Sequence, residues 1–164
     1  MISVIICSRN KNIDNSLKQN IANSIGIDYE LVVIDNSNNK YSIFSAYNEG
    51  VRRAQYPILC FMHEDILFHS KDWGVNAKSI LEKNEIGLLG VIGGRYLADY
   101  PSTWFSTVYT NGKILQGTKN NDNDYQYIED VRNLDFEDTK EVCAVDGLWF
   151  CVKKELFDKI SFDE

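Results

Sequence analysis

The first ninety residues alternate between short apolar runs and longer segments in which apolar side chains recur every three or four positions. The runs lack polar alternation, which is typical of strands covered on both faces; they are residues 3–7, 31–34, 58–62 and 87–92. The segments between them have the apolar stripe of amphipathic helices. The order βαβαβαβ predicts an α/β protein with an open, mainly parallel sheet flanked by helices.

Cap and turn residues set the limits of the predicted helices. Asn12 or Asp14 is a candidate cap for the first helix, and Gly26 follows its last apolar position. Ser70 or Asp72 is a candidate cap for the third helix. In an open α/β sheet, ligands bind outside the carboxyl ends of the strands, so the loops after these strands are the first place to look for a site.

The periodicity ends at residue 93. Residues 93–140 are rich in aromatic residues, Gly, Asn and Asp, and we expect loops and sheet edge that face a substrate. Strand-like runs return at 142–145 and 148–152, and a short helix is expected over 153–159. We find neither an internal repeat nor a linker, so the 164 residues are expected to form a single domain.

Composition and charge exclude some classes of function. The formal net charge is -7 and there is no basic patch, which argues against nucleic-acid binding. The N-terminus lacks a basic segment and its apolar run is too short for a signal peptide or a membrane span, so we expect a cytoplasmic protein. The four cysteines, Cys7, Cys60, Cys143 and Cys151, are scattered among apolar residues and are expected to be buried, reduced thiols.

Acidic residues follow two of the predicted strands. Asp35 ends one strand, and Glu64 and Asp65 come directly after His63 at the end of another. Oxygen-rich strand ends suit Mg²⁺ or Mn²⁺, and Mn²⁺ also accepts imidazole. The alternative is that these residues are solvated loop acids, which are common in any protein.

Four ordered segments resemble the glycosyltransferase family 2-like proteins of GT-A fold; they are 3–10, 31–37, 46–51 and 61–65. The resemblance implies the GT-A fold, with residues 1–93 as the nucleotide-sugar-binding half and 94–164 as an acceptor-side part that is incomplete at its C-terminus. It implies transfer of a sugar, as by a hexosyltransferase, from a nucleoside diphosphate donor to an acceptor hydroxyl. The expected acceptor is a saccharide or glycolipid, in surface polysaccharide or glycolipid synthesis, with inversion at the sugar and with peripheral membrane contact allowed.

The same resemblance implies roles for particular residues. His63 stands where the family carries the first acid of its Asp-x-Asp motif, as in a His-x-Asp subgroup, so Asp65 and His63 are the expected ligands of Mn²⁺ or Mg²⁺. For His63 the alternative is a structural histidine at a strand end. The residues expected to bind the substrate are Cys7, Ser8, Arg9, Asp35, Asn48, Glu64 and Trp149.

Asp146 is the candidate catalytic base, because the segment 145–149 resembles the acceptor-side turn of the family. Its alternative is a residue that caps a bend, and the alternative for Trp149 is a core position instead of a platform for a sugar ring. The segment 162–164 resembles the approach to a further acidic motif, which leads us to expect that the family's base lies beyond residue 164 and that transfer by this chain is slow.

Two other functions remain open at the level of sequence. One is a nucleotide-sugar-binding or carbohydrate-binding module without turnover, and the other is a generic doubly wound domain, such as a flavodoxin-like partner module. The absence of a G-x-G-x-x-G turn after the first strand argues against a dinucleotide fold.

Overall fold

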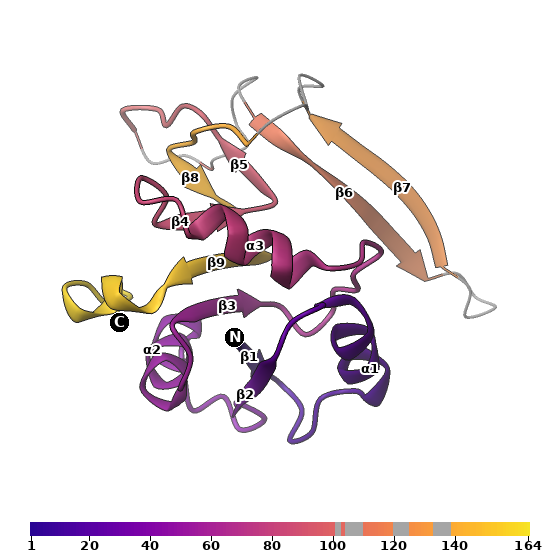
Figure 1. Ribbon diagram of the computed structural model, residues 1–164. Helices are drawn as coiled ribbons and strands as arrows, with labels where there is room; N and C mark the ends of the chain where they lie inside the picture. Colours follow the sequence, from indigo (N-terminus) through magenta and orange to yellow (C-terminus); the bar gives the residue numbers. More distant parts are fainter. Residues whose placement is uncertain (101–102, 104–109, 120–124, 133–138) are drawn as a thin grey trace. The chain divides into compact units, whose positions relative to one another are not determined.

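The computed structural model describes residues 1–100, 103, 110–119, 125–132 and 139–164. The chain divides into two compact units: the first contains residues 1–89 and 147–164, and the second contains residues 90–146. Each unit is built on its own sheet (Figure 1). The last eighteen residues thus belong to the first unit.

The first unit contains all the helices of the predicted βαβ pattern. Its elements are β1 (Ile2–Ser8), α1 (Asn15–Ser24), β2 (Tyr29–Asp35), α2 (Ile43–Arg53), β3 (Ile58–Met62), α3 (Trp73–Leu81), β4 (Leu88–Gly90), β9 (Trp149–Lys153) and the 3₁₀-helix η1 (Lys154–Asp158). The first three predicted strands, the three helices and the short C-terminal helix are therefore confirmed. In the described part of the chain, no helix is long and apolar enough to cross a membrane.

The sheet of the first unit has the order β2-β1-β3-β9-β4. Both β2 and β3 pair with β1 in parallel, as predicted. The predicted fourth strand, 87–92, is divided: β4 ends the first sheet, and residues 92–94 form a strand of the second sheet. The place next to β3 is taken by β9, which runs antiparallel to it.

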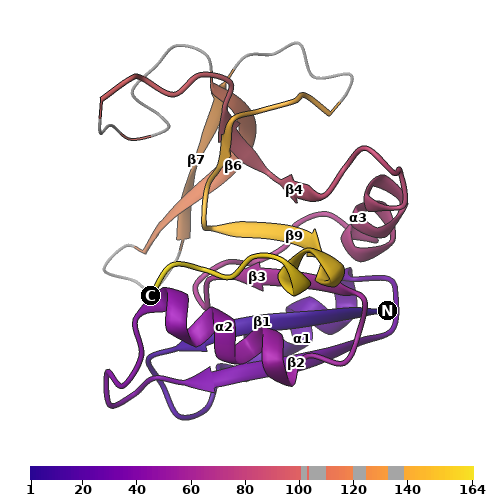
Figure 2. The same ribbon diagram turned by 90° about the vertical axis from the view of Figure 1, so that its left-hand side faces the viewer.

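Helices lie on both faces of the first sheet (Figures 1 and 2), and apolar side chains fill the space on each face. On one face, α1 and α3 pack against alternate residues of β1 and β3, and this cluster includes Leu17, Ile21, Ala77 and Leu81 from the helices. On the other face, aromatic rings of α2, η1 and the C-terminal segment surround Phe61, which stacks on Phe150 with 4.9 Å between ring centroids. The strands of the sheet centre are thus buried on both faces, which explains their lack of polar alternation.

One of the two aspartates expected to cap a helix does so, and the other does not. Asp14 caps α1 by accepting a hydrogen bond from the Ser16 amide at 2.7 Å. Asp72 precedes α3 but makes no side-chain cap; it has a left-handed φ of 57° and lies against Gly26, where a Cβ would overlap it. Gly26 itself has φ 71°, the conformation that glycine provides after a helix.

The second unit contains a four-stranded sheet in the order β7-β6-β5-β8. Its strands are β5 (Ile92–Gly94), β6 (Thr110–Lys119), β7 (Tyr125–Arg132) and β8 (Ala144–Val145). Residues 93–140 were expected to form loops and sheet edge. β7 is an edge strand of this sheet, and β6, which pairs with it in a long antiparallel hairpin, lies inside the sheet. The Asn- and Asp-rich run 120–124, part of the 93–140 segment, lies outside the described residues.

All four cysteines are free, but only two are buried. Cys60 and Cys151 face each other across β3 and β9 in the core. Cys7 is half-buried. Cys143 precedes β8 and is exposed, and its Sγ donates a hydrogen bond to the Arg95 carbonyl at 3.1 Å. The expectation of four buried thiols was therefore wrong for Cys7 and Cys143.

The close approach of α2 to β1 gives a test of this packing. A Cβ on Gly50 would overlap the Cγ2 methyl of the fully buried Ile5. At a solvent-exposed position inside a helix, Gly→Ala raises the free energy of unfolding by about 1 kcal/mol. Here we expect Gly50→Ala to lower the free energy of unfolding by about 1–3 kcal/mol, because overpacking outweighs that gain. The measurement is urea denaturation, with Gly147→Ala as control, since a Cβ there meets nothing within 4 Å. Equal stability of the two variants would contradict this packing.

Candidate functional site

The carboxyl ends of β2, β1 and β3 lie side by side at one edge of the first sheet. Ser8 pairs with Asp35 in the β1–β2 ladder, and Ile6 pairs with Met62 in the β1–β3 ladder. Because neighbouring strands are about 4.8 Å apart, the three ends lie within about 10 Å of one another. The residues that follow these strands therefore gather at one place, as the parallel topology predicted.

Asp35 ends β2 with an exposed side chain. Its Oδ1 accepts a hydrogen bond from the Ser37 amide at 3.0 Å. Hydrogen bonds from the Ser37 side chain and backbone hold the pKa of the Asp35 carboxyl below its ordinary value. Asp35 is therefore ionised at neutral pH and presents a hydrogen-bond acceptor to solvent.

Asn36 fixes the loop that follows Asp35. Its side-chain nitrogen Nδ2 donates a hydrogen bond to the Tyr41 carbonyl at 2.9 Å, and its Oδ1 accepts one from the Tyr41 backbone amide at 2.8 Å. The Asn36 side chain thus pairs with the Tyr41 backbone as the backbone of an adjacent strand would. The backbone amide of Asn36 also donates to the Ser8 carbonyl at 2.8 Å. No such role for Asn36 was predicted from the sequence.

Cys7 lies next to this loop in β1. Burial raises the pKa of its thiol, and a hydrogen bond with the Asn36 side chain opposes that rise in part. Cys7 is therefore a neutral thiol at pH 7 and not an activated nucleophile.

Glu64 turns its carboxylate toward β1. Its Oε1 accepts a hydrogen bond from the Arg9 amide at 3.1 Å, and its Oε2 accepts one from the hydroxyl of the buried Ser8. The Asn10 amide donates to the same Ser8 hydroxyl at 3.1 Å. Of the residues expected to bind the substrate, Ser8, Arg9 and Glu64 are thus brought together by contacts to one another.

His63 and Asp65, which flank Glu64, have exposed side chains. The His63 backbone amide donates to the Leu148 carbonyl at 3.0 Å, which fixes the end of β3 beside β9. Their side chains are 48% and 82% exposed, and His63 Nδ1 lies 4.0 Å from Asp65 Oδ1. No group of three or more His, Cys, Asp and Glu side chains able to hold a metal occurs among the described residues. The structure places the two expected metal ligands together as an exposed pair.

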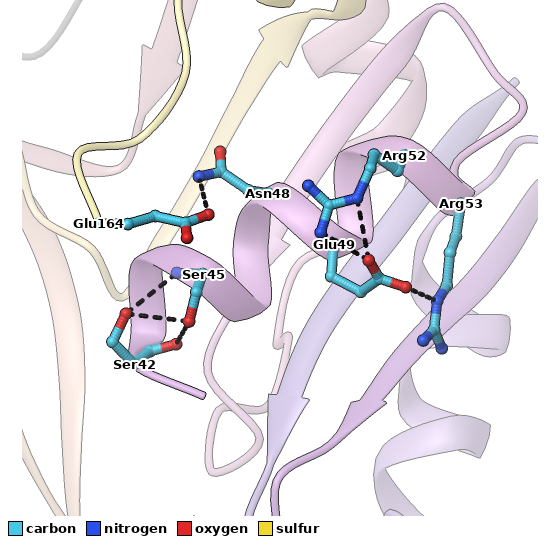
Figure 3. A network of polar contacts seen from close by, with 7 residues as sticks. All are labelled: Ser42, Ser45, Asn48, Glu49, Arg52, Arg53 and Glu164. Atoms are coloured by element: carbon cyan, nitrogen blue, oxygen red, sulfur yellow. Dashed lines mark hydrogen bonds and ion pairs between the residues drawn. The ribbon is translucent and has the colours of Figure 1, made fainter. Parts of the chain in front are cut away.

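Asn48 lies on α2, where its amide holds the C-terminal segment (Figure 3). The amide nitrogen donates to the Phe162 carbonyl at 3.0 Å and to Glu164 Oε1 at 2.8 Å, and Oδ1 accepts from the Phe162 amide at 3.0 Å. Asn48 is 8% exposed. The same helix carries an exposed network in which Glu49 accepts hydrogen bonds from Arg52 and Arg53. Asn48 thus has its donors engaged within the protein, a role that sequence reasoning missed.

Trp149 begins β9 and is 4% exposed. Its ring meets that of Trp73 edge-on, with 5.8 Å between centroids. A ring at this depth has no face open to a sugar, so the packing favours the core alternative for Trp149.

Asp146 belongs to the second unit, where its backbone amide donates to the Ile92 carbonyl at 2.9 Å. The residue is partly exposed at the end of β8. It follows Val145, whose side chain lies against Gly90 so closely that a Cβ there would overlap it at 2.8 Å. The backbone before Asp146 is therefore held by packing within the unit that contains residues 90–146.

A family model described as "Glycosyltransferase like family" matches residues 3–164. The chain is also 28% identical over 130 residues to the streptomycin biosynthesis protein StrF of Streptomyces griseus, a match that covers 77% of this chain and 41% of StrF. The chain thus spans about two fifths of the length of that relative. Because the family model extends over nearly every residue, including all of the strand ends described above, the chain belongs to the glycosyltransferase-like family.

Proposed function

We propose that this chain binds a nucleoside diphosphate sugar in a GT-A-type fold and takes part in transfer of the sugar to an acceptor hydroxyl. One observation carries the proposal: an ionised, exposed Asp35 stands at the carboxyl end of β2, and an exposed His63–Asp65 pair follows the carboxyl end of β3, the two strands that pair with β1 in parallel. This is where open α/β sheets bind their ligands. Membership of the glycosyltransferase-like family supports the reaction class.

The nucleoside is proposed to bind at the ends of β1 and β2. Asp35 offers an ionised acceptor for hydroxyl or N–H groups of the ribose or base, and the Asn36–Tyr41 pairing holds its loop in place. Arg9 is exposed beside it and carries a guanidinium that can bind phosphate in bidentate fashion. Cys7 and Ser8 are the last residues of β1 beneath this proposed nucleoside site; Cys7 is half-buried and Ser8 is buried.

A divalent cation is proposed at His63 and Asp65. The donor chemistry fits: a carboxylate suits Mg²⁺ or Mn²⁺, and an imidazole suits Mn²⁺. Two protein donors are also what a substrate-bridged ion needs, because Mg²⁺ sites of this kind are held by one or two carboxylates together with substrate phosphates and waters. When bound, the ion would neutralise charge on the diphosphate leaving group.

In the proposed reaction, the acceptor oxygen bonds to the anomeric carbon as the bond from that carbon to the diphosphate oxygen breaks. The acceptor hydroxyl proton goes to a carboxylate, for which we propose Asp146, and the diphosphate leaves with the electron pair of the broken bond. Displacement from the opposite side inverts the anomeric centre. We propose a hexose donor and a saccharide or glycolipid acceptor used in surface polysaccharide or glycolipid synthesis.

The metal proposal is tested by calorimetry with UDP, GDP and dTDP, in Mn²⁺ or in chelator. We expect at least one of them to bind in Mn²⁺ and to bind about 10- to 100-fold more weakly in chelator or to the Asp65→Asn variant, because the amide loses the charge that a hard cation selects. Asp158→Asn, at an exposed residue of η1, is the control for loss of one negative charge. Equal affinity with and without chelator would refute the metal site.

His63 gives a second test of the same site. Asp restores a carboxylate ligand at this position, so His63→Asp should keep Mn²⁺-dependent binding, whereas His63→Leu should weaken it by about tenfold or more. Wild-type affinity in His63→Leu would show that the histidine is structural.

For Asp35 we expect the Asp35→Ala variant to bind the same nucleoside diphosphate about 10- to 100-fold more weakly, which corresponds to loss of a hydrogen bond to a charged group. Asp28→Ala is the matched control, because Asp28 is an exposed aspartate just before the opposite end of the same strand. The dependence on Mn²⁺ should stay intact in both variants. An unchanged Kd for Asp35→Ala would remove Asp35 from the nucleoside site.

Asp146 is tested by kinetics of the natural protein that carries this sequence. The Asp146→Asn variant should bind donor normally but transfer sugar about 100- to 10,000-fold more slowly, because the amide cannot accept the acceptor proton. Transfer at the wild-type rate would assign the base elsewhere. Donor binding without transfer by the wild-type protein, with every suitable acceptor tried, would favour a non-catalytic nucleotide-sugar-binding module.

A further inference from the structure

Glu64 is the middle residue of the His63-Glu64-Asp65 segment, yet its carboxylate points back into the protein. We propose that Glu64 is a positioning residue that links the loop after β3 to the loop after β1, so that the metal-facing and nucleotide-facing parts of the donor site form one rigid surface. This inference rests on the proposed donor site. It replaces the sequence-based expectation that Glu64 binds the substrate directly.

The need for such a link follows from where the backbone pairing ends. The β1–β2 ladder continues to Ser8 and Asp35, and the Asn36 amide extends it by donating to the Ser8 carbonyl. The β1–β3 ladder stops two residues earlier, at Ile6 and Met62. Beyond this point the hydrogen bonds of the Glu64 side chain connect the end of β3 to the end of β1.

Glu64 is suited to this position because it meets two different donors. Oε1 accepts from the Arg9 backbone amide at 3.1 Å, and Oε2 accepts from the Ser8 hydroxyl. Ser8 has no exposed surface, so its hydroxyl is held in place by packing. Hydrogen bonds to a carboxylate are shorter and stronger than neutral ones. The link therefore fixes the backbone of Arg9, the residue proposed to meet the phosphates.

The flanking residues differ from Glu64 in exposure and contacts. His63 and Asp65 are 48% and 82% exposed, whereas both oxygens of Glu64 are engaged with β1. In this proposal His63 and Asp65 bind the cation, and Glu64 between them positions the loop. A loop held in its binding conformation gains affinity because less conformational entropy is lost when ligand binds.

The main test compares two substitutions of Glu64. In Glu64→Gln, the amide oxygen can still accept from Arg9, and the amide nitrogen can donate to the Ser8 hydroxyl, which is then free to donate to the Asn10 carbonyl at 2.8 Å. Glu64→Ala removes both contacts. With Mn²⁺ and UDP, GDP or dTDP in calorimetry, we expect Glu64→Gln to bind within about threefold of wild type and Glu64→Ala to bind about tenfold more weakly.

A ligand role for Glu64 would give a different pattern. If the carboxylate bound the metal or the substrate, Glu64→Gln would be as weak as Glu64→Ala, because both lack the charge, and this result would overturn the proposal. A double-mutant cycle adds Ser8→Ala: for a shared link, Ser8→Ala and Glu64→Ala together should cost less affinity than the product of the two single effects. Fully independent effects would also overturn it.

Hydrogen exchange of the Arg9 amide tests the link without any ligand. We expect exchange to be about tenfold faster in Glu64→Ala than in wild type or Glu64→Gln, since local opening no longer breaks a hydrogen bond. Unchanged exchange would refute the link. If exchange changes as expected but wild type binds none of the three diphosphates, the proposed function fails while the structural link stands. Thermal melts verify that each variant is folded at the temperature of the measurement.

Discussion

The parallel pairing of β1 with β2 on one side and β3 on the other is the constraint on which the rest of the first unit depends. It places the carboxyl ends of three strands at one edge, although their loops are separated by more than twenty residues in the sequence. The pairing is maintained because both faces of β1 are buried: Ile2, Val4 and Ile6 pack on one side and Ile5 lies under α2 on the other. A slip by one residue would exchange these faces, so the register is well determined.

Polar side chains complete this edge where the backbone ladders stop. Asn36 pairs with Tyr41 through both atoms of its amide, and Glu64 accepts from two donors of the β1 end. In each case one side chain makes the hydrogen bonds that a further pair of backbone residues would have made if the strands had continued. The loops thereby hold their shape while Asp35, His63 and Asp65 keep their own side chains exposed. Such a division between fixed backbone and open side chains is what a preformed binding site requires.

The sequence predicted the elements of the first unit well because their signals are local. The helical stripes and the uninterrupted apolar runs gave α1 to α3 and β1 to β3, and the acidic strand ends gave the place of the candidate site. The local sequence patterns failed to predict strands that form only through pairing with another strand. The β6–β7 hairpin has exposed positions on much of its length, so its sequence lacks the apolar alternation of a half-buried strand.

The sequence by itself determined which residues form the helices α1 to α3 and the strands β1 to β3, and that acids follow β2 and β3, because periodicity and chain order carry that information. Only the tertiary structure decided that β9 lies antiparallel beside β3, that Trp149 is in the core, and that Asn48 holds the C-terminal segment. It also decided that Glu64 turns toward Ser8 and Arg9 while Asp65, its neighbour, stays exposed. The reason is physical: a polar residue after a strand can equally bind a ligand or another loop, and the partner within reach is set by strand order and register, which local sequence does not contain.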